Sequence, residues 1–299
     1  MPIFGITKWA VSLNKHMIVF LSYIFYFITA SASPLQRRWL AKTKNIDNAG
    51  QIAFAFHVTL VTVILSLGLL IYQPFSITGN IFHLGIATLL CGIFGAVAYV
   101  FSYKAQKHVE AGVTSVIANI YTPVTIILAT IFLSEKLTPI QILGTVVLLI
   151  GILIVSKKHK TGKFTFDKYF LMMLLSGIFL GVLLVAERYL QKTTGFTTGT
   201  MLSWWSTCLF LGLITLFTKN KHTYSKKDVL TTGTLRFLQN LSWVSLVYIV
   251  GNLSIVSAIT TFKIIFMFIA GALFLNERED LLTKIIGSLV ALVGLFLMK

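Results

Sequence analysis

The chain contains one apolar hairpin written twice. Residues Ser115–Val155 read SVIANIYTPVTIILATIFLSEKLTPIQILGTVVLLIGILIV, and residues Ser257–Met298 read SAITTFKIIFMFIAGALFLNEREDLLTKIIGSLVALVGLFLM. In each copy the opening serine precedes a glutamate, Glu135 or Glu277, by twenty positions. Each copy consists of an apolar stretch, a short acidic and basic corner, and a second apolar stretch. Duplicated membrane hairpins are typical of secondary transporters, so this repeat predicts a transport fold.

Composition places most of the chain in lipid. Of its 299 residues, 56% are hydrophobic and 11% are charged, whereas a soluble domain carries roughly 25% charged residues. The apolar runs last about 20 residues, which suits helices, because barrel strands need about 10 alternating residues. We therefore expect an all-α polytopic membrane protein with ten transmembrane helices. The expected spans are Met17–Pro34, Gln51–Tyr72, Ile81–Tyr103, Ala111–Leu133, Pro139–Ser156, Tyr169–Leu190, Thr197–Phe217, Val229–Val250, Leu253–Leu275 and Leu282–Met298.

A basic stretch divides these spans into two halves. We expect residues 1–156 to form a first five-helix repeat, residues 157–168 a basic linker loop, and residues 169–299 a second five-helix repeat. Because five is odd, the second repeat enters the membrane from the opposite side, and the two repeats are inverted around a central cavity. Two such halves can exchange conformations, which is the physical basis of alternating access.

The corner of the hairpin carries a family resemblance. It reads SEKLT at Ser134–Thr138 and NERED at Asn276–Asp280, so the second copy keeps Glu-Arg and loses Leu-Thr. An apolar helix, a Glu-Arg/Lys-Leu-Thr corner and a glycine-spaced helix resemble the EamA family of the drug/metabolite transporter superfamily, over essentially the whole chain. The resemblance implies a ten-helix basket whose central cavity is lined mainly by spans 1, 3, 4, 6, 8 and 9. It says little about the substrate.

Small residues mark places where helix backbones approach closely. They serve either contacts within each half or a homodimer face, so we expect a monomer or a homodimer, with the internal role favoured. The small-residue pairs and stripes are Gly144 with Gly151, Gly177 with Gly181, and Gly287 with Ala291 and Gly294.

Lysine and arginine are unevenly shared between the two membrane sides. Seventeen of the 25 fall on one side of the expected topology and six on the other. The positive-inside rule makes the richer side cytoplasmic and therefore puts both termini outside. The family resemblance implies the reverse, with both termini in the cytoplasm. The charge count favours termini outside, and the family resemblance keeps the other orientation open.

The net charge of +16 does not predict a nucleic-acid partner. The cations flank apolar runs, which is the usual membrane pattern, so the expected partners are membrane lipid and a small-molecule substrate. Cys91 and Cys208 lie inside apolar runs and offer neither a metal spacing nor a disulfide framework. Ala30–Ala32 resembles a signal-peptidase site, but its removal would break the repeat, so we expect a first spanning helix.

The sequence contains no Walker motif, zinc-hydrolase motif or nucleophile elbow. We therefore expect no enzyme activity and no cofactor or metal, and any transport is secondary or passive. The expected location is a bacterial inner membrane.

Two ionisable residues lie well inside an expected span. Lys263 lies near the middle of span 9, and Arg236 lies about a third of the way along span 8. Each costs about 2.5–3.5 kcal/mol at a helix centre, which favours a functional role. The alternatives are a structural pair of Lys263 with Glu187 or a carbonyl group, and snorkelling of either side chain to the interface. A fixed cation facing a cavity suits a carboxylate or phosphate. Span 1 has no acidic residue, which argues against a cation exporter.

Further candidates fall at similar depth. We expect Pro123 to act as a hinge, because proline frees a carbonyl group and can open span 4 where it faces a cavity. His57 is interpreted as structural, and Trp204 and Trp205 are interpreted as interface or packing residues. Amides and aromatic rings suit the orientation of a small ligand. The expected substrate-binding residues beside Lys263 and Arg236 are Asn119, Tyr121, Gln239, Asn240, Tyr99 and Trp243.

The function predicted from the sequence is secondary transport, in the direction of export, of small polar metabolites such as amino acids. Anionic and zwitterionic compounds rank above cationic drugs. The alternatives are an uptake permease or exchanger for a nucleotide-like or S-adenosyl metabolite, and a membrane subunit that does not itself transport.

Overall fold

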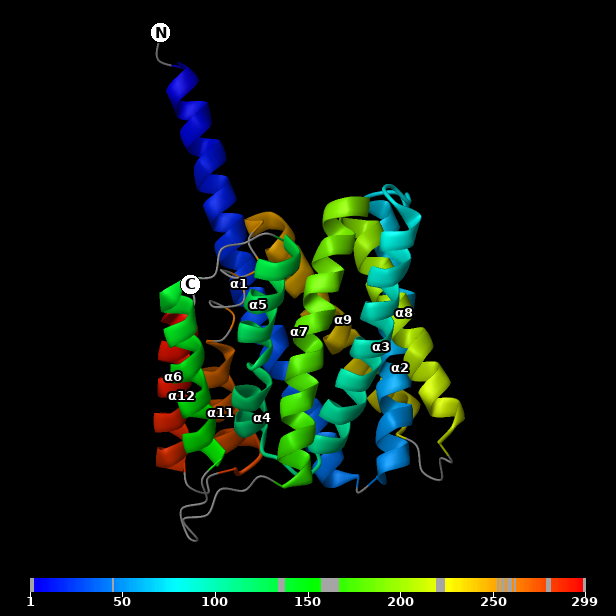
Figure 1. Ribbon diagram of the computed structural model, residues 1–299, viewed down its shortest axis with the longest axis vertical. Helices are drawn as coiled ribbons and strands as arrows, with labels where there is room; N and C mark the ends of the chain where they lie inside the picture. Colours follow the sequence, from blue (N-terminus) through cyan, green and yellow to red (C-terminus); the bar gives the residue numbers. More distant parts are fainter. Residues whose placement is uncertain are drawn as a thin grey trace.

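The structure is a computed structural model that describes residues 3–44, 46–133, 138–156, 167–218, 224–251, 253, 256, 260, 262–277 and 281–297. Within these residues every regular element is helical, and the helices run up and down a bundle (Figure 1). The helices are α1 (Ile3–Thr43), α2 (Asn48–Ser66), the 3₁₀ helix η1 (Leu67–Ile71), α3 (Ile81–Ala105), α4 (Ala111–Ala118), α5 (Tyr121–Leu133), α6 (Pro139–Ser156), α7 (Lys168–Thr194), α8 (Phe196–Leu216), α9 (Lys226–Val250), α11 (Lys263–Phe274) and α12 (Leu281–Leu297).

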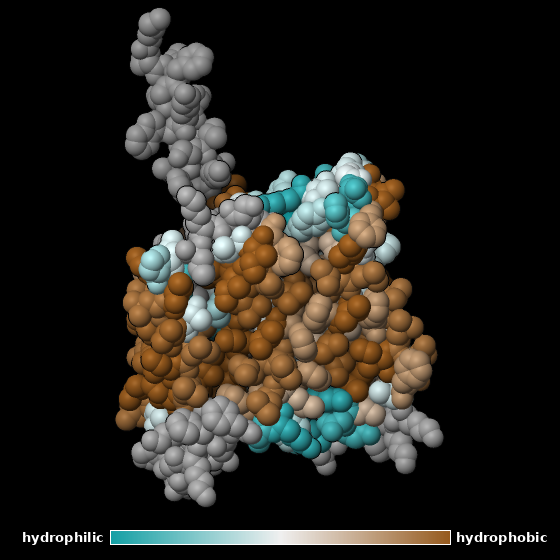
Figure 2. Space-filling view, viewed as in Figure 1, coloured by the Kyte–Doolittle hydropathy of each residue, from teal (hydrophilic) through white to brown (hydrophobic). Residues whose placement is uncertain are grey.

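The helices are those of a membrane protein. Within the described residues, six stretches are long and apolar enough to cross a membrane, and three shorter apolar helices accompany them. One face of the bundle shows a continuous hydrophobic band, with hydrophilic residues at its two ends (Figure 2). In water this surface would be very unfavourable, whereas in lipid it is solvated. The all-helical membrane fold is therefore confirmed, and the count of ten spans stays a prediction.

Polar residues define where several helices begin and end. The Asp47 side chain accepts a hydrogen bond from the Gly50 amide at the start of α2, and Asn80 and Asp167 cap α3 and α7 in the same way. These acceptors satisfy amide groups that have no partner inside the helix. Gly251 ends α9 with φ of 76°, a left-handed conformation that glycine adopts without strain.

The contacts between helices follow an inverted repeat. If α1, α2, α3 and α6 correspond to α7, α8, α9 and α12, the contact of α3 with α7 corresponds to that of α9 with α1. In the same way the contact of α3 with α8 corresponds to that of α9 with α2. The contacts of α6 with α12 and of α2 with α8 correspond to themselves. This exchange of partners is what a pseudo-two-fold axis between two inverted halves requires.

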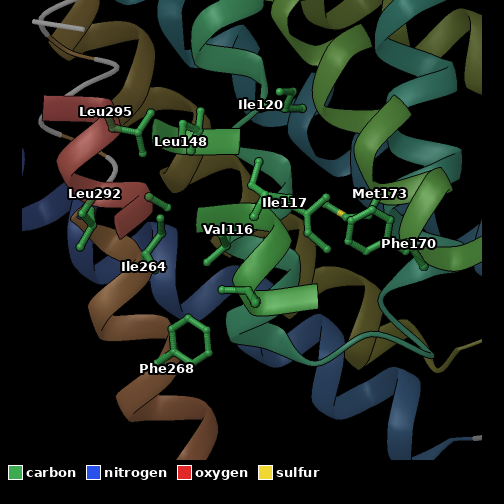
Figure 3. Packing of buried hydrophobic residues seen from close by; sticks show 14 of the residues in the cluster. Val116, Ile117, Ile120, Leu148, Phe170, Met173, Ile264, Phe268, Leu292 and Leu295 are labelled. Atoms are coloured by element: carbon green, nitrogen blue, oxygen red, sulfur yellow. The ribbon is translucent and has the colours of Figure 1, made fainter. Parts of the chain in front are cut away.

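The largest apolar cluster joins the two repeats. It packs α4 and α6 of the first half against α7, α11 and α12 of the second, as Figure 3 shows. Ile117 and Leu148 from the first half, and Ile264 and Leu295 from the second, are completely buried in it. The cluster therefore fixes the hairpins beside the middle of the bundle and leaves the centre to polar residues.

The glycine motifs also pack one half against the other. A Cβ atom at Gly151 of α6 would lie 2.5 Å from the Ala291 amide nitrogen of α12, so the backbones approach closely there. Gly177 and Gly181 of α7 face the junction of α4 and α5. The favoured prediction, that these glycines pack helices of the same half together, is therefore wrong. The motifs serve contacts inside one chain, but between its halves, because the repeats interlock.

Two spans differ from their expected form. Helix α1 continues through Pro34 to Thr43, although the expected span ended at Pro34. Span 4 is interrupted, because α4 ends at Ala118 and α5 begins at Tyr121. In both places the local sequence contains a proline, and the surrounding bundle decides whether the helix continues or breaks.

Candidate functional site

A cavity of about 110 Å³ lies between the two halves, in the middle of the bundle. Residues of α1, α2, α3, α5, α7, α8, α9 and α11 line it. Seven of the eight side chains predicted to bind substrate lie around this one cavity. They are Tyr99, Tyr121, Arg236, Gln239, Asn240, Trp243 and Lys263.

Two cations form one wall of the cavity, and aromatic rings hold both. The guanidinium carbon of Arg236 lies 4.3 Å from the centroid of the Tyr99 ring. The Lys263 ammonium donates a 3.4 Å hydrogen bond to the Tyr26 hydroxyl and lies 5.5 Å from the Tyr121 ring centroid. Ring faces and hydroxyl groups stabilise a cation without neutralising it. Both charges therefore remain available to an anionic group.

Trp243 of α9 contacts the rings of both Tyr26 and Tyr121, and these three rings form an aromatic frame at the cavity. Its ring lies 5.8 Å from the Tyr26 ring and 6.2 Å, edge to face, from the Tyr121 ring. These rings come from α1, α5 and α9, so contacts between different helices fix their orientation. A frame of this kind presents ring faces and edges to a small ligand at little cost in conformational entropy.

The interruption of span 4 places Tyr121 at the cavity. The amides of Asn119 and Ile120 bond to carbonyl groups three residues earlier, which tightens the chain before α5 begins. Pro123 lies in the first turn of α5 and has no amide hydrogen to donate. The Thr122 amide instead donates to the Asn119 carbonyl, the acceptor that another residue at position 123 would use. In the second half, α11 begins at Lys263, the counterpart of Tyr121. Each half thus starts a helix at the site, as in other transporters with discontinuous helices.

Asn119 is the predicted binding residue that does not line this cavity. Its side chain is completely buried, and its amide group donates a 2.8 Å hydrogen bond to the Ser115 carbonyl on its own helix. The turn after Ala118 directs it toward the helix instead. His57 bonds through Nδ1 to the Ala53 carbonyl, which is in keeping with the structural role predicted for it.

A second cavity of about 110 Å³ continues toward the membrane side that carries most of the basic residues. It shares Tyr99, Arg236 and Lys263 with the central cavity, so these side chains separate the two spaces. Arg37, buried and placed over the Tyr103 ring, lines it as well. Positive charge therefore extends from the basic side to the centre of the bundle.

An ion pair lies at the basic end of this second cavity, where Arg38 and Gln106 line it. The Arg38 guanidinium donates to the Glu277 carboxylate at 2.8 Å and to the Gln106 carbonyl at 2.7 Å. The other carboxylate oxygen of Glu277 accepts from the Ala111 amide at 2.8 Å. Glu277, the glutamate of the duplicated corner, therefore ties α1 to the α3–α4 connection. The corresponding Glu135 lies outside the described residues.

Glu187, Trp204 and Arg37 are among the cavity residues that the sequence analysis did not predict. Glu187 lies three residues before the end of the expected span Tyr169–Leu190, but α7 continues to Thr194, and Glu187 lines the central cavity. Trp204 was assigned to packing or the interface, yet it lines the same cavity, whereas its neighbour Trp205 is 40% exposed. Arg37 lies beyond the expected end of the first span at Pro34 and is buried, because α1 extends to Thr43. A helix that outlasts its apolar run gives no signal in a hydropathy pattern.

Comparison with known proteins agrees with this architecture. A protein of Streptantibioticus cattleyicolor described as a probable terminal-alkyne amino-acid exporter is 27% identical over 175 residues. The match covers 56% of this chain and 57% of that protein, so it spans little more than half of the relative. A solved crystal structure superimposes with a TM-score of 0.59, covering 94% of this chain and 96% of the other. At 10% identity, it supports the fold alone.

The family is shown by a match that runs twice along the chain. The model of the EamA-like transporter family matches residues 16–157 and again residues 167–299. These two segments contain the two inverted halves and all of the side chains around the central cavity. The chain belongs to the EamA-like transporter family.

Proposed function

We propose that the protein is a secondary exporter of amino acids or of other small anionic or zwitterionic metabolites in a bacterial inner membrane. The observation that carries the proposal is the convergence of Arg236 and Lys263 on one cavity between inverted halves. Fixed cations at mid-membrane suit a carboxylate, which is the group that amino acids share. The amino-acid exporter among the relatives supports the same substrate class.

Alternating access supplies the mechanism. The central cavity and the second cavity meet at Tyr99, Arg236 and Lys263, so the cations face both. A substrate carboxylate entering from the basic side meets Arg37 first and then the paired cations. Rearrangement of the two halves then opens the opposite side around the same residues. Among the described residues no group of three or more His, Cys, Asp or Glu could hold a metal ion.

The test is transport by the purified full chain in proteoliposomes. Lys263→Ala removes a cavity cation and is expected to lower the uptake or counterflow of radiolabelled amino acids at least tenfold. Lys227→Ala, which removes an exposed cation at the start of α9, is the matched control and is expected to transport normally. AMP and S-adenosylmethionine serve as comparison substrates. Normal amino-acid transport by Lys263→Ala would reject the proposed role, and preferential transport of the nucleotides would support the alternative substrate class.

A further inference from the structure

Glu187 is a deeply buried acid that the proposed carboxylate site does not use. It lies on α7 with 5% of its surface exposed. Its Oε1 atom accepts no hydrogen bond within the described part of the chain. Among those residues the ion pairs are Arg38–Glu277 and Glu110–Lys284, and Glu187 belongs to neither. A buried carboxylate outside any ion pair is unfavourable, so its presence needs a reason other than stability.

The position of Glu187 is opposite to that of the cations. Arg236 and Lys263 line both the central cavity and the second cavity. Glu187 lines the central cavity but not the second. Glu187 also lines a third, smaller cavity with Arg188 and Trp243, and neither Arg236 nor Lys263 lines that space. Arg188 does not line the central cavity, and its guanidinium donates to the Gly251 carbonyl. The central cavity therefore has a basic end and an acidic end, with aromatic rings between them.

The surroundings of Glu187 offer hydrogen-bond acceptors. The Ser203 hydroxyl on α8 also lines the central cavity, is 1% exposed, and has no hydrogen-bond partner in the described residues. The nearby Thr207 hydroxyl already donates to carbonyl groups, including that of Cys91 at 3.0 Å. An ammonium group carries three N–H donors and forms its strongest hydrogen bonds with a carboxylate. A carboxylate beside an unsatisfied hydroxyl is a suitable site for such a group.

We propose that Glu187, with Ser203, binds the ammonium group of a zwitterionic substrate whose carboxylate lies at Arg236 and Lys263. This inference rests on the proposed function and adds the second half of substrate recognition. The cavity then selects α-amino acids over simple carboxylates, because only a zwitterion satisfies both ends. A carboxylic acid without an amino group would leave Glu187 buried and unpaired.

The test compares ligands that differ by one charged group. The probes are 2-amino-4-pentynoic acid, 4-pentynoic acid, which lacks the amino group, and but-3-ynylamine, which lacks the carboxylate. Calorimetry on the purified full chain in detergent measures each dissociation constant. We expect Glu187→Gln to weaken binding of the amino acid at least tenfold and to leave 4-pentynoic acid within twofold of wild type. Lys263→Ala is expected to weaken both carboxylates.

The controls separate charge from folding. Asp228→Asn makes the same acid-to-amide change outside all three cavities and is expected to leave the dissociation constants unchanged. Glu187→Asp keeps the charge and is expected to retain part of the preference for the amino acid.

The outcomes distinguish the two proposals. An equal preference for the amino acid in Glu187→Gln and wild type overturns the role of Glu187 alone. Wild-type protein that binds 4-pentynoic acid as tightly as the amino acid also overturns this inference, while carboxylate transport stands. If wild type binds neither carboxylate, the proposed function fails, and the inference fails with it.

Discussion

Tyr99 supports Arg236 through the face of its ring, 4.3 Å from the guanidinium carbon. This contact fixes a flexible side chain at the boundary between two cavities. Cation–π contacts contribute about 0.5–2 kcal/mol. Tyr99→Leu is therefore expected to raise the dissociation constant for a substrate amino acid by about two- to thirtyfold, as measured by calorimetry.

The matched control for this prediction keeps the ring. Tyr99→Phe retains the aromatic face and is expected to bind within about threefold of wild type. A Phe variant as weak as the Leu variant would show that the hydroxyl group, and not the ring, is what matters at this position.

At the scale of single residues, the sequence indicated charged residues within apolar runs more readily than the contacts that each side chain makes. Lys263 and Arg236 stood out because charge inside an apolar run is rare. Glu187 did not, because α7 extends beyond its apolar run and carries the acid deeper than hydropathy indicates. Asn119 turned out to bond its own helix, a choice set by one turn of backbone geometry that composition does not encode.

At the scale of elements, Glu277 joins parts of both halves. It holds Arg38 of α1 and the first amide of α4 with its two oxygens. Glu277→Gln weakens the ion pair and is expected to favour conformations in which this end is open. Labelling of a cysteine introduced at Ser102, which lines the second cavity, is expected to become at least threefold faster than with native Glu277.

The control is Glu110→Gln, which breaks the other ion pair of this side, with Lys284, away from the second cavity. The cysteine introduced at Ser102 is expected to be labelled at the same rate in the Glu110→Gln variant as in the protein that keeps Glu110. Equal rates for both glutamine variants would mean that Glu277 acts as a structural cap of α4 and does not control access.

The glycines of α6 and α12 make a second prediction at this scale. A Cβ atom at Gly151 would meet the backbone of Ala291, so Gly151→Ala is expected to lower the stability by about 1–3 kcal/mol. Gly85 of α3 has no neighbour within 4 Å. Gly85→Ala is therefore expected to be neutral or stabilising, because alanine favours helix by about 1 kcal/mol. Thermal unfolding in detergent compares the two variants.

Most of the helices could be predicted, and their interruptions could not. The span Pro139–Ser156 coincides with α6 because a proline begins it and a basic stretch follows it. By contrast, Pro34 lies inside α1, whereas span 4 breaks four residues before Pro123. Both outcomes depend on whether packed neighbours satisfy the freed carbonyl group, which is a tertiary property.

At the scale of the whole molecule, the basic residues gather at one end. Lys42, Lys104, Lys168 and Lys226 lie at helix ends on the side opposite to the start of α1 and the end of α12 (Figure 1). The positive-inside rule predicts that this basic end is cytoplasmic. Alkaline phosphatase fused to the C-terminus is therefore expected to be active outside the cytoplasm, and green fluorescent protein fused there is expected to be dark. Bright fluorescence would instead support the orientation implied by the family.

The contact of α6 with α12 has a consequence for how the molecule can move. Each of these helices is the counterpart of the other, so exchanging the conformations of the two halves returns this contact to itself. Leu148 and Leu295, both completely buried there, need not separate at any stage of the cycle. We therefore expect this contact to stay closed throughout the proposed transport cycle. A covalent cross-link along it would leave turnover intact, whereas the same link between α3 and α7 would arrest it.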